Sequence, residues 1–236
     1  MLEVRALSCG YGSVTVVHGL DLDVMPGQIT ALLGPNGAGK SSAIMAIAGH
    51  TAVKAGGITF EGESILGMSP ADRTRLGIAI VPEGRRVFPD LTVSENLLVG
   101  GYVRSKAEAS SNEERVLALF PRLKERHRQR AATLSGGEQQ MLAIGRALMA
   151  SPRLIMIDEL SLGLMPAMVD LCINAIRSLT QQGIGVLLVE QNTHRAIAVA
   201  DHVTVLVSGR MAFRGNSDLV RNDPSFADKY LGVSAH

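Results

Sequence analysis

Short runs of apolar residues alternate with longer segments of helical periodicity along most of the chain. Four runs, at residues 29–33, 78–81, 154–157 and 186–189, are apolar throughout, as expected of strands buried on both faces of a sheet. Because helical segments separate them, we expect parallel strands joined by crossover helices. The pattern therefore predicts an α/β fold, with ligands bound beyond the carboxyl ends of the strands.

Two other regions, residues 2–24 and 203–214, show the alternation of hairpins, and the second contains a Ser208-Gly209 turn. We expect both to lie in a separate antiparallel layer that forms a smaller β lobe. Residues 216–236 predict a helical segment followed by an exposed end.

The middle of the chain, residues 91–150, is mainly helical and predicts an inserted helical lobe. Its basic run at 122–130 is interpreted as a solvated face, with a binding patch as the alternative. We expect a single domain whose core comprises residues 1–90 and 151–236 and includes the β lobe.

Composition narrows the class of protein. Hydrophobic residues make up 46% of the chain and charged residues 19%, which is typical of a folded globular protein. The net charge of +1 gives no general attraction to nucleic acid, so we expect no nucleic-acid partner. Cys9 and Cys172 match no metal-ligand spacing, and no apolar run approaches the ~20 residues of a membrane span. The two cysteines indicate a reduced compartment, and the N-terminal segment has no apolar run of signal-peptide length, so we expect a cytoplasmic protein.

A Gly-rich segment follows the first buried run and precedes a helical pattern at 42–48. It fits G-x-x-x-x-G-K-[ST], the form of a phosphate-binding loop, over Gly34, Pro35, Asn36, Gly37, Ala38, Gly39, Lys40 and Ser41. Its glycines let backbone N–H groups converge on phosphate oxygens, Lys40 neutralises those oxygens, and the Ser41 hydroxyl can ligate Mg²⁺. We assign the next residue, Ser42, to the same nucleotide site. A flexible turn with an exposed lysine is the alternative.

Two carboxylates end the buried run at 154–157. Asp158 and Glu159 would leave negative charge unpaired unless a cation lies beside them. Asp158 is therefore the candidate Mg²⁺ ligand, and Glu159 is the candidate general base that polarises the attacking water. Taken alone, the pair is better explained by solvated acids at a strand end, but its combination with the Lys40 loop favours the metal site.

A second small-residue turn, LSGGEQQ at residues 134–140, precedes a helical pattern at 138–149. By itself it predicts an anion-binding helix start, or simply a capped helix entered through two glycines. Together with the other motifs it resembles the signature of the ABC (ATP-binding cassette) ATPases, and the resemblance covers nearly the whole chain. It implies ATP, Mg²⁺ and a P-loop NTPase fold with a RecA-like core, a mostly parallel sheet, an N-terminal antiparallel β lobe and an inserted α-helical lobe.

The resemblance also implies a two-site dimer, in which the signature turn of one subunit caps the ATP held by the other. The residues that would act in trans are Ser135, Gly136, Gly137 and Glu138. Tyr11 falls where the family places an aromatic residue that stacks on adenine, although a lone tyrosine near a hairpin is also commonly part of a core or an interface.

Three positions differ from the commonest family pattern. Glu83 stands where most members have a glutamine that reaches Mg²⁺ and the attacking water, and we hypothesise that Glu83 contacts Mg²⁺ directly or through water. Gln191 replaces a switch histidine; its amide can donate to the γ-phosphate but does not titrate. His194, three residues later, is interpreted as a surface histidine. Met165 replaces an aspartate, so a cross-dimer contact of this segment would use backbone groups.

These departures, with the segments VPEGRRVFPDLTVSENL and LLVEQN and an ending YLG, resemble one ATPase subunit of the importers for branched-chain amino acids and their relatives for urea or short amides. The resemblance implies ATP hydrolysis that powers import at the cytoplasmic face of the membrane. The implied partners are a second ATPase subunit, identical or a sister, two transmembrane permease subunits and, indirectly, a solute-binding protein.

A groove between residues 83–88 and 91–98 would receive a short helix of the permease, with Arg85 and Arg86 facing acidic groups there or forming a plain solvated pair. Two other functions remain as alternatives: the ATPase of a lipid or glycan exporter, and a non-transport ABC ATPase of DNA repair or translation. The single cassette and the lack of a long coiled-coil insertion disfavour the second.

Overall fold

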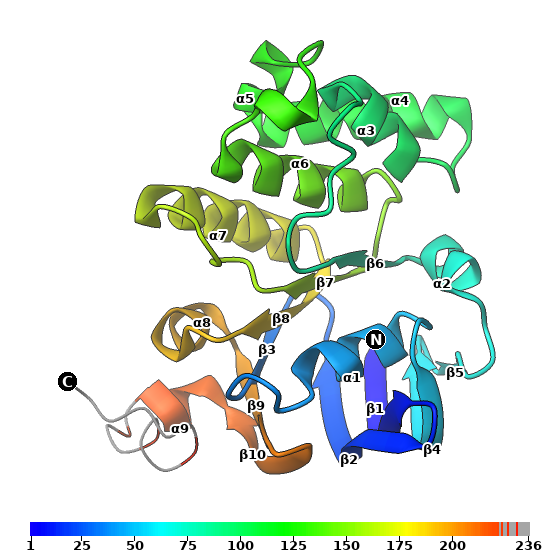
Figure 1. Cartoon of the computed structure of the whole chain (residues 1–236), viewed down its shortest axis with the longest axis vertical. Helices are drawn as coiled ribbons and strands as arrows, with labels where there is room; N and C mark the ends of the chain where they lie inside the picture. The colour runs from blue at the N-terminus through cyan, green and yellow to red at the C-terminus, as the bar shows by residue number, and fades with distance from the viewer. Residues whose placement is uncertain (222, 224–225, 227–229, 231–236) are drawn as a thin grey trace.

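The computed structural model describes residues 1–221, 223, 226 and 230. Among these residues one ten-stranded sheet runs through the molecule in the order β5-β4-β1-β2-β10-β9-β3-β8-β7-β6 (Figure 1). Its strands are β1 (Leu2–Tyr11), β2 (Val14–Val24), β3 (Ile29–Leu33), β4 (Ala52–Phe60), β5 (Glu63–Ser64), β6 (Ile78–Val81), β7 (Leu154–Asp158), β8 (Gly185–Glu190), β9 (His202–Val207) and β10 (Arg210–Asn216).

The four predicted buried strands are confirmed as β3, β6, β7 and β8, and they pair in parallel. Alternate residues of each strand pack into two apolar clusters on opposite faces of the sheet. In β7, for example, Ile155 and Ile157 face the cluster under α6, α7 and α8, whereas Leu154 and Met156 face the cluster that includes α1. Both faces are covered, which explains why these strands are apolar throughout.

The hairpin predicted at 203–214 is confirmed, but its placement in a separate layer is wrong. Ser208 and Gly209 join β9 to β10, and both have a left-handed backbone, with φ of 49° and 76°, as a two-residue hairpin turn requires. However, β9 also pairs in parallel with β3, so it belongs to the core of the sheet. Its residues 203–206 are all buried, because a strand at this position is covered on both faces.

The antiparallel part of the sheet comprises β1, β2, β4 and β5. Helix α1 contacts β1, β2 and β4 as well as β7. Its Ile44 and Ile47 are fully buried in the same apolar cluster as Met156 and Leu187 of the core strands. The helix is therefore held between the two parts of the sheet, which fixes the position of its first residue, Lys40.

Helices α3 to α6 lie together at one end of the molecule, at the top of Figure 1. Helix α1 begins at Lys40 and α6 begins at Gly136, in each case two residues earlier than predicted. None of the helices in the described residues is long and apolar enough to span a membrane. The predicted helix after 216 is present as α9, while the predicted exposed end, with residues 231–236, lies outside the described residues. The α-helices are α1 (Lys40–Ile47), α2 (Pro70–Leu76), α3 (Val93–Gly100), α4 (Lys106–Leu119), α5 (Pro121–Glu125), α6 (Gly136–Leu148), α7 (Pro166–Gln181), α8 (Thr193–Val199) and α9 (Ser217–Arg221).

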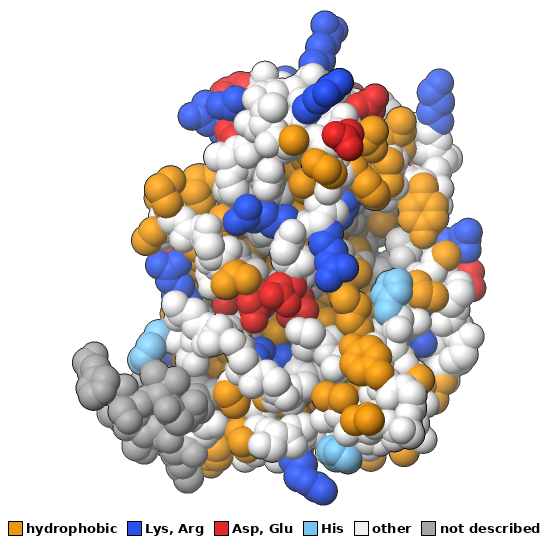
Figure 2. All heavy atoms as spheres, in the orientation of Figure 1, with side chains coloured by type: hydrophobic (Ala, Val, Ile, Leu, Met, Phe, Trp, Pro, Cys, Tyr) orange, Lys and Arg blue, Asp and Glu red, His pale blue; other side chains and the backbone are white. Residues whose placement is uncertain are grey.

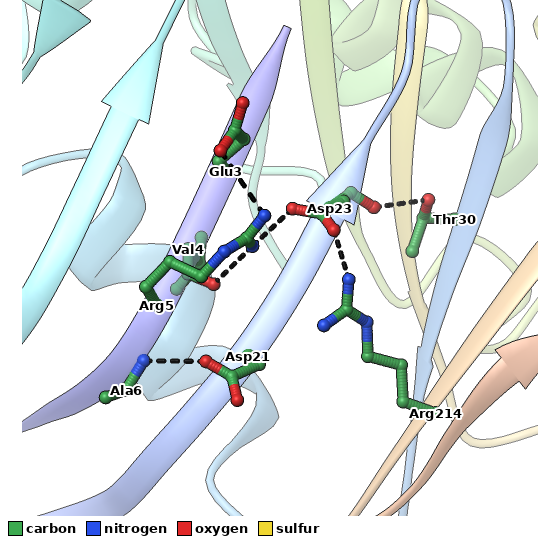
Figure 3. Close-up of polar contacts among 8 residues, drawn as sticks. All are labelled: Glu3, Val4, Arg5, Ala6, Asp21, Asp23, Thr30 and Arg214. Carbon is green, nitrogen blue, oxygen red and sulfur yellow. Dashed lines mark hydrogen bonds and ion pairs between the residues drawn. The ribbon is translucent and has the colours of Figure 1, made fainter. Parts of the chain in front are cut away.

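A polar cluster joins β1 and β2 to β10, whose backbone pairing with β2 is sparse (Figure 3). Among the described residues, β2 and β10 share one paired position. The Asp23 carboxylate of β2 accepts hydrogen bonds from Arg5 of β1, at 2.5 Å, and from Arg214 of β10. The Asp23 carbonyl accepts from the Thr30 hydroxyl at 2.8 Å. Side chains thus supply the connection that the strand ladder lacks at this point.

Candidate nucleotide site

The loop between β3 and α1 is shaped by glycines that no other residue could replace without strain. A Cβ on Gly34 would lie 2.2 Å from the carbonyl oxygen of Leu206 in β9, and one on Gly39 would lie 2.8 Å from a methyl group of Val17 in β2. Both glycines have positive φ, 153° and 99°. Gly37 also has positive φ but faces open space. The loop is therefore packed against β2 and β9 on one side and open on the other.

Lys40 lies at the start of α1 and is only 5% exposed. Its ammonium group donates to the carbonyl oxygens of Gly34, at 2.8 Å, and Pro35, at 3.1 Å. Burial lowers the pKa of Lys40, and four nearby carboxylates oppose this effect. The next residue, Ser41, is exposed, whereas Ser42 is buried and its carbonyl accepts from the thiol of Cys9 at 3.6 Å.

The four carboxylates that act on Lys40 belong to Glu83, Asp158, Glu159 and Glu190. They lie at or just after the ends of three parallel neighbours, β6, β7 and β8. Figure 2 shows acidic side chains gathered in the middle of one face of the molecule, with basic side chains above them. The structure thus brings together the predicted residues of the loop and of the strand ends.

Asp158 has the chemistry expected of a metal ligand. Its side chain is almost wholly buried, and its Oδ1 atom has no hydrogen-bond partner among the residues that the structure describes. Burial raises the pKa of Asp158 to about 6; the Ser41 hydroxyl and Lys40 oppose the rise, while Glu83 and Glu159 add to it. A buried carboxylate oxygen without a donor is costly unless a cation binds it.

Mg²⁺ fits this donor set. It prefers oxygen ligands and is usually held by one or two carboxylates together with phosphate oxygens and water. The orphaned Asp158 oxygen and the Ser41 hydroxyl are such donors, and the charge of Glu83 acts on Asp158 from the neighbouring strand end. The described residues contain no group of three or more His, Cys, Asp or Glu able to hold a metal by themselves, so phosphate or water would complete the shell.

Glu159 is held in an unusual backbone conformation. Its φ is 56°, in the left-handed region that costs a non-glycine residue on the order of 1–3 kcal/mol. Its N–H donates to the carbonyl of Val189 in β8 at 2.9 Å. Glu159, Ser161, Glu190 and Gln191 line a cavity of about 330 Å³. The candidate base and the candidate phosphate donor Gln191 therefore face one space.

The signature turn is held by its own side chains. Ser135 caps α6: its hydroxyl accepts from the N–H of Glu138 at 3.4 Å, and Glu138 Oε2 accepts from the N–H of Ser135 at 2.9 Å. Oε1 of Glu138 pairs with Arg126 at 2.6 Å. Both oxygens of Glu138 are engaged, so this residue stabilises the turn, whereas Ser135, Gly136 and Gly137 remain candidates for contact with a nucleotide.

The turn packs against residues other than those of the Lys40 loop. If Gly136 carried a Cβ, its three nearest atoms would all belong to Arg85. If Gly137 carried a Cβ, its three nearest atoms would all belong to Met168. Arg85 also donates to Oε1 of Gln139 at 3.3 Å and is partly buried, so it lies against the signature turn and is not half of a plain solvated pair. Sequence reasoning missed this contact, because nothing in the pattern pairs the loop after β6 with the start of α6.

Two further predicted residues are exposed. Tyr11, at the end of β1, is 55% exposed, so its ring is accessible to a base. His194, in the first turn of α8, is exposed as predicted for a surface histidine. Sequence reasoning missed Glu190, although a charged residue at the end of the apolar run 186–189 was a readable signal.

A lysine-bearing loop between a parallel strand and a helix, facing carboxylates at neighbouring strand ends, defines a phosphate-binding-loop ATPase. Residues 17–161 match the family described as ABC transporter, and the chain belongs to this family. It is an ATP-binding subunit that hydrolyses ATP to energise transport. The fold agrees: a nucleotide-free ATP-binding cassette from an ABC transporter superposes with a TM-score of 0.87 at 26% identity, covering 99% of each chain.

Relatives that align over nearly their whole length include ATP-binding proteins of amino acid transport and of lipopolysaccharide export. The chain is 45% identical to BraG of Pseudomonas aeruginosa, a high-affinity branched-chain amino acid transport ATP-binding protein, over 98% of this chain and 100% of BraG. BraF of the same organism, which has the same description, is 30% identical over 98% of both chains. The lipopolysaccharide export ATP-binding protein LptB of Haemophilus influenzae is 31% identical over 98% of this chain and 97% of LptB.

The raised pKa of Asp158 predicts a pH-dependent loss of stability. The folded protein holds a proton on Asp158 up to about pH 6, whereas the unfolded chain releases it near 3.8. The free energy of unfolding therefore falls as the pH rises from about 4 to about 6. Asp158→Asn removes this fall, so we expect it to be more stable than the wild type at pH 7 without Mg²⁺, by about 1–3 kcal/mol, while losing ATP hydrolysis.

Denaturant unfolding of both proteins in EDTA at pH 4, 5, 6 and 7 measures this difference. Adding Mg²⁺ and ATP should stabilise the wild type more than the variant. Parallel pH profiles for the two proteins would show that Asp158 is not the buried, destabilising carboxylate.

Proposed function

We propose that the chain powers an ABC importer for branched-chain or other amino acids, or for urea or short amides. The observation that carries the proposal is its full-length similarity to BraG, at 45% identity, in a chain whose strand ends bring carboxylates to Lys40. The lower identity to LptB, at 31%, makes export of a lipid or glycan the second candidate. The solute itself would be selected by a separate solute-binding protein.

The residues divide the chemistry of hydrolysis among themselves. The backbone N–H groups of the loop and the Lys40 ammonium bind the β- and γ-phosphates, and the Tyr11 ring stacks on adenine. Ser41 and Asp158 would hold Mg²⁺, and the ion would supply positive charge to neutralise the phosphate oxygens. Glu159 accepts a proton from the attacking water, and the side-chain amide of Gln191 donates to the γ-phosphate.

Glu83 is the residue whose role depends most on the metal. A carboxylate beside a triphosphate repels it unless a cation lies between them. Glu83 is exposed and acts on both Lys40 and Asp158. We therefore assign it to Mg²⁺, directly or through a bound water.

The working unit would be a pair of ATPase subunits. In that pair, Ser135, Gly136 and Gly137 of one subunit meet the ATP bound by the Lys40 loop of the other. BraG and BraF are two ATP-binding proteins of one organism that are described by the same transport role, which supports a pair of non-identical sisters. In the proposed domain organisation, residues 1–90 and 151–236 bind ATP and residues 91–150 carry the signature turn.

Membrane association would come through two permease subunits, which places the chain at the cytoplasmic face. Four large apolar side chains in or next to α3 are exposed and offer a docking surface: Phe88, Leu98, Val99 and Tyr102. Asn96 holds the backbone of Phe88 against α3. Its buried amide donates to the carbonyl of Phe88 at 3.0 Å, and its oxygen accepts from the N–H of Phe88 at 2.9 Å.

Removal of the proposed base should separate hydrolysis from binding. Glu159→Gln keeps the size of the side chain but cannot accept the proton, so we expect turnover to fall by ~10²–10⁴ with unchanged ATP affinity. Steady-state hydrolysis and equilibrium binding of ATP measure the two quantities. Glu114→Gln, at an exposed position of α4, is the matched control, and turnover of Glu159→Gln equal to that control would remove Glu159 from the role.

Co-purification distinguishes import from export. The chain, carrying an affinity tag, is extracted from membranes in mild detergent, and its partners are identified by mass spectrometry. We expect two permease subunits and a second ATPase whose complex binds an amino acid or amide through a solute-binding protein. Recovery of lipid- or glycan-export components would favour the second candidate, and the absence of any membrane protein would contradict both.

A further inference from the structure

Glu190, the last residue of β8, is a buried carboxylate for which the proposed hydrolysis has no use. It is 4% exposed. Its Oε1 atom accepts from the backbone N–H of Ser161 at 2.9 Å, and its Oε2 atom accepts from the Ser161 hydroxyl at 2.9 Å. Burial raises the pKa of Glu190, and hydrogen bonds from Ser161, Asn192 and Gln191 oppose the rise. The carboxylate thus links the segment after β7 to the segment after β8.

The segment that Glu190 holds contains the proposed base. Between the end of β7 and Ser161 stand only Glu159, in its left-handed conformation, and Leu160, which is 1% exposed. A strained residue keeps its geometry only when its neighbours over-determine it. Three fixed points surround Glu159: its own N–H on the carbonyl of Val189, the buried Leu160 side chain, and the two bonds from Ser161 to Glu190.

Glu190 also borders the proposed phosphate donor. Gln191 follows it directly, and both residues line the 330 Å³ cavity with Glu159 and Ser161. A change in the position of Glu190 would therefore move both sides of the cavity. Because the chemistry requires a water aligned between base and phosphate, a misplacement of about 1 Å can cost on the order of 10² in rate.

We propose that Glu190 is a positioning residue. By accepting two hydrogen bonds from Ser161, it fixes the positions of Glu159 and Gln191 relative to each other. The inference rests on the proposed ATPase reaction and on the role of Glu159 within it. Glu190 does not touch the reacting atoms. Its effect passes through the two hydrogen bonds to Ser161, and a buried acid is suited to this task because both of its oxygens accept.

The test is Glu190→Gln, which keeps the shape but replaces one acceptor oxygen with a donor group. We expect single-turnover hydrolysis to slow by about tenfold or more, with ATP affinity unchanged and with a melting temperature equal to or above that of the wild type. Ser161→Ala removes the hydroxyl but keeps the N–H, so it should slow hydrolysis less. Glu114→Gln makes the same chemical change at an exposed position and serves as the control.

Repeating the substitution in the Glu159→Gln variant distinguishes a positioning role from a general contribution to the stability of the fold. In Glu159→Gln the base is already absent, so adding Glu190→Gln should change the residual rate by less than about twofold. An equal fold-loss in both backgrounds, or a wild-type rate for Glu190→Gln alone, overturns the proposal. If the purified transporter that contains the wild-type chain hydrolyses no ATP, the proposed function itself fails; if only the Glu190 effect is missing, the positioning role fails and the function stands.

Discussion

Negative charge crowded at the carboxyl ends of parallel strands is the constraint on which this structure depends. Glu83, Asp158, Glu159 and Glu190 all act on the buried ammonium of Lys40. Burial still prevails at Asp158, whose pKa rises to about 6. A triphosphate would add further negative charge beside these carboxylates, so a cation between the carboxylates and the phosphate is needed to offset their repulsion.

Much of the surrounding architecture serves to keep these groups in place. Helix α1 is packed between the two parts of the sheet, which holds its first residue, Lys40, near the carboxylates. Gly34 and Gly39 allow the loop to lie against β9 and β2 where any side chain would collide. The capping box of Ser135 and Glu138 fixes the start of α6 in the same way. Function in this chain is thus prepared by packing and local hydrogen bonds before any ligand binds.

Features with a local signal could be predicted from the sequence. The buried strands, the loop around Lys40 and the acids after β7 are each encoded in a few consecutive residues. The place of β9 could not be predicted, because periodicity identifies a strand without naming its neighbours. The clamp between Glu190 and Ser161 joins residues far apart in the chain, and its detection requires the register of β7 and β8. The S-x-x-E pattern indicates a capping role for Glu138, but the resemblance to the signature led to its assignment as a residue that acts in trans.

The most direct test of the account is the affinity for ATP with and without Mg²⁺, measured by calorimetry in the slow Glu159→Gln variant. If the strand-end carboxylates require a cation, Mg²⁺ should tighten ATP binding by at least about tenfold, which corresponds to about 1.4 kcal/mol. Equal affinity in Mg²⁺ and in EDTA would contradict the account, because it would show that the triphosphate is held beside these carboxylates without a metal.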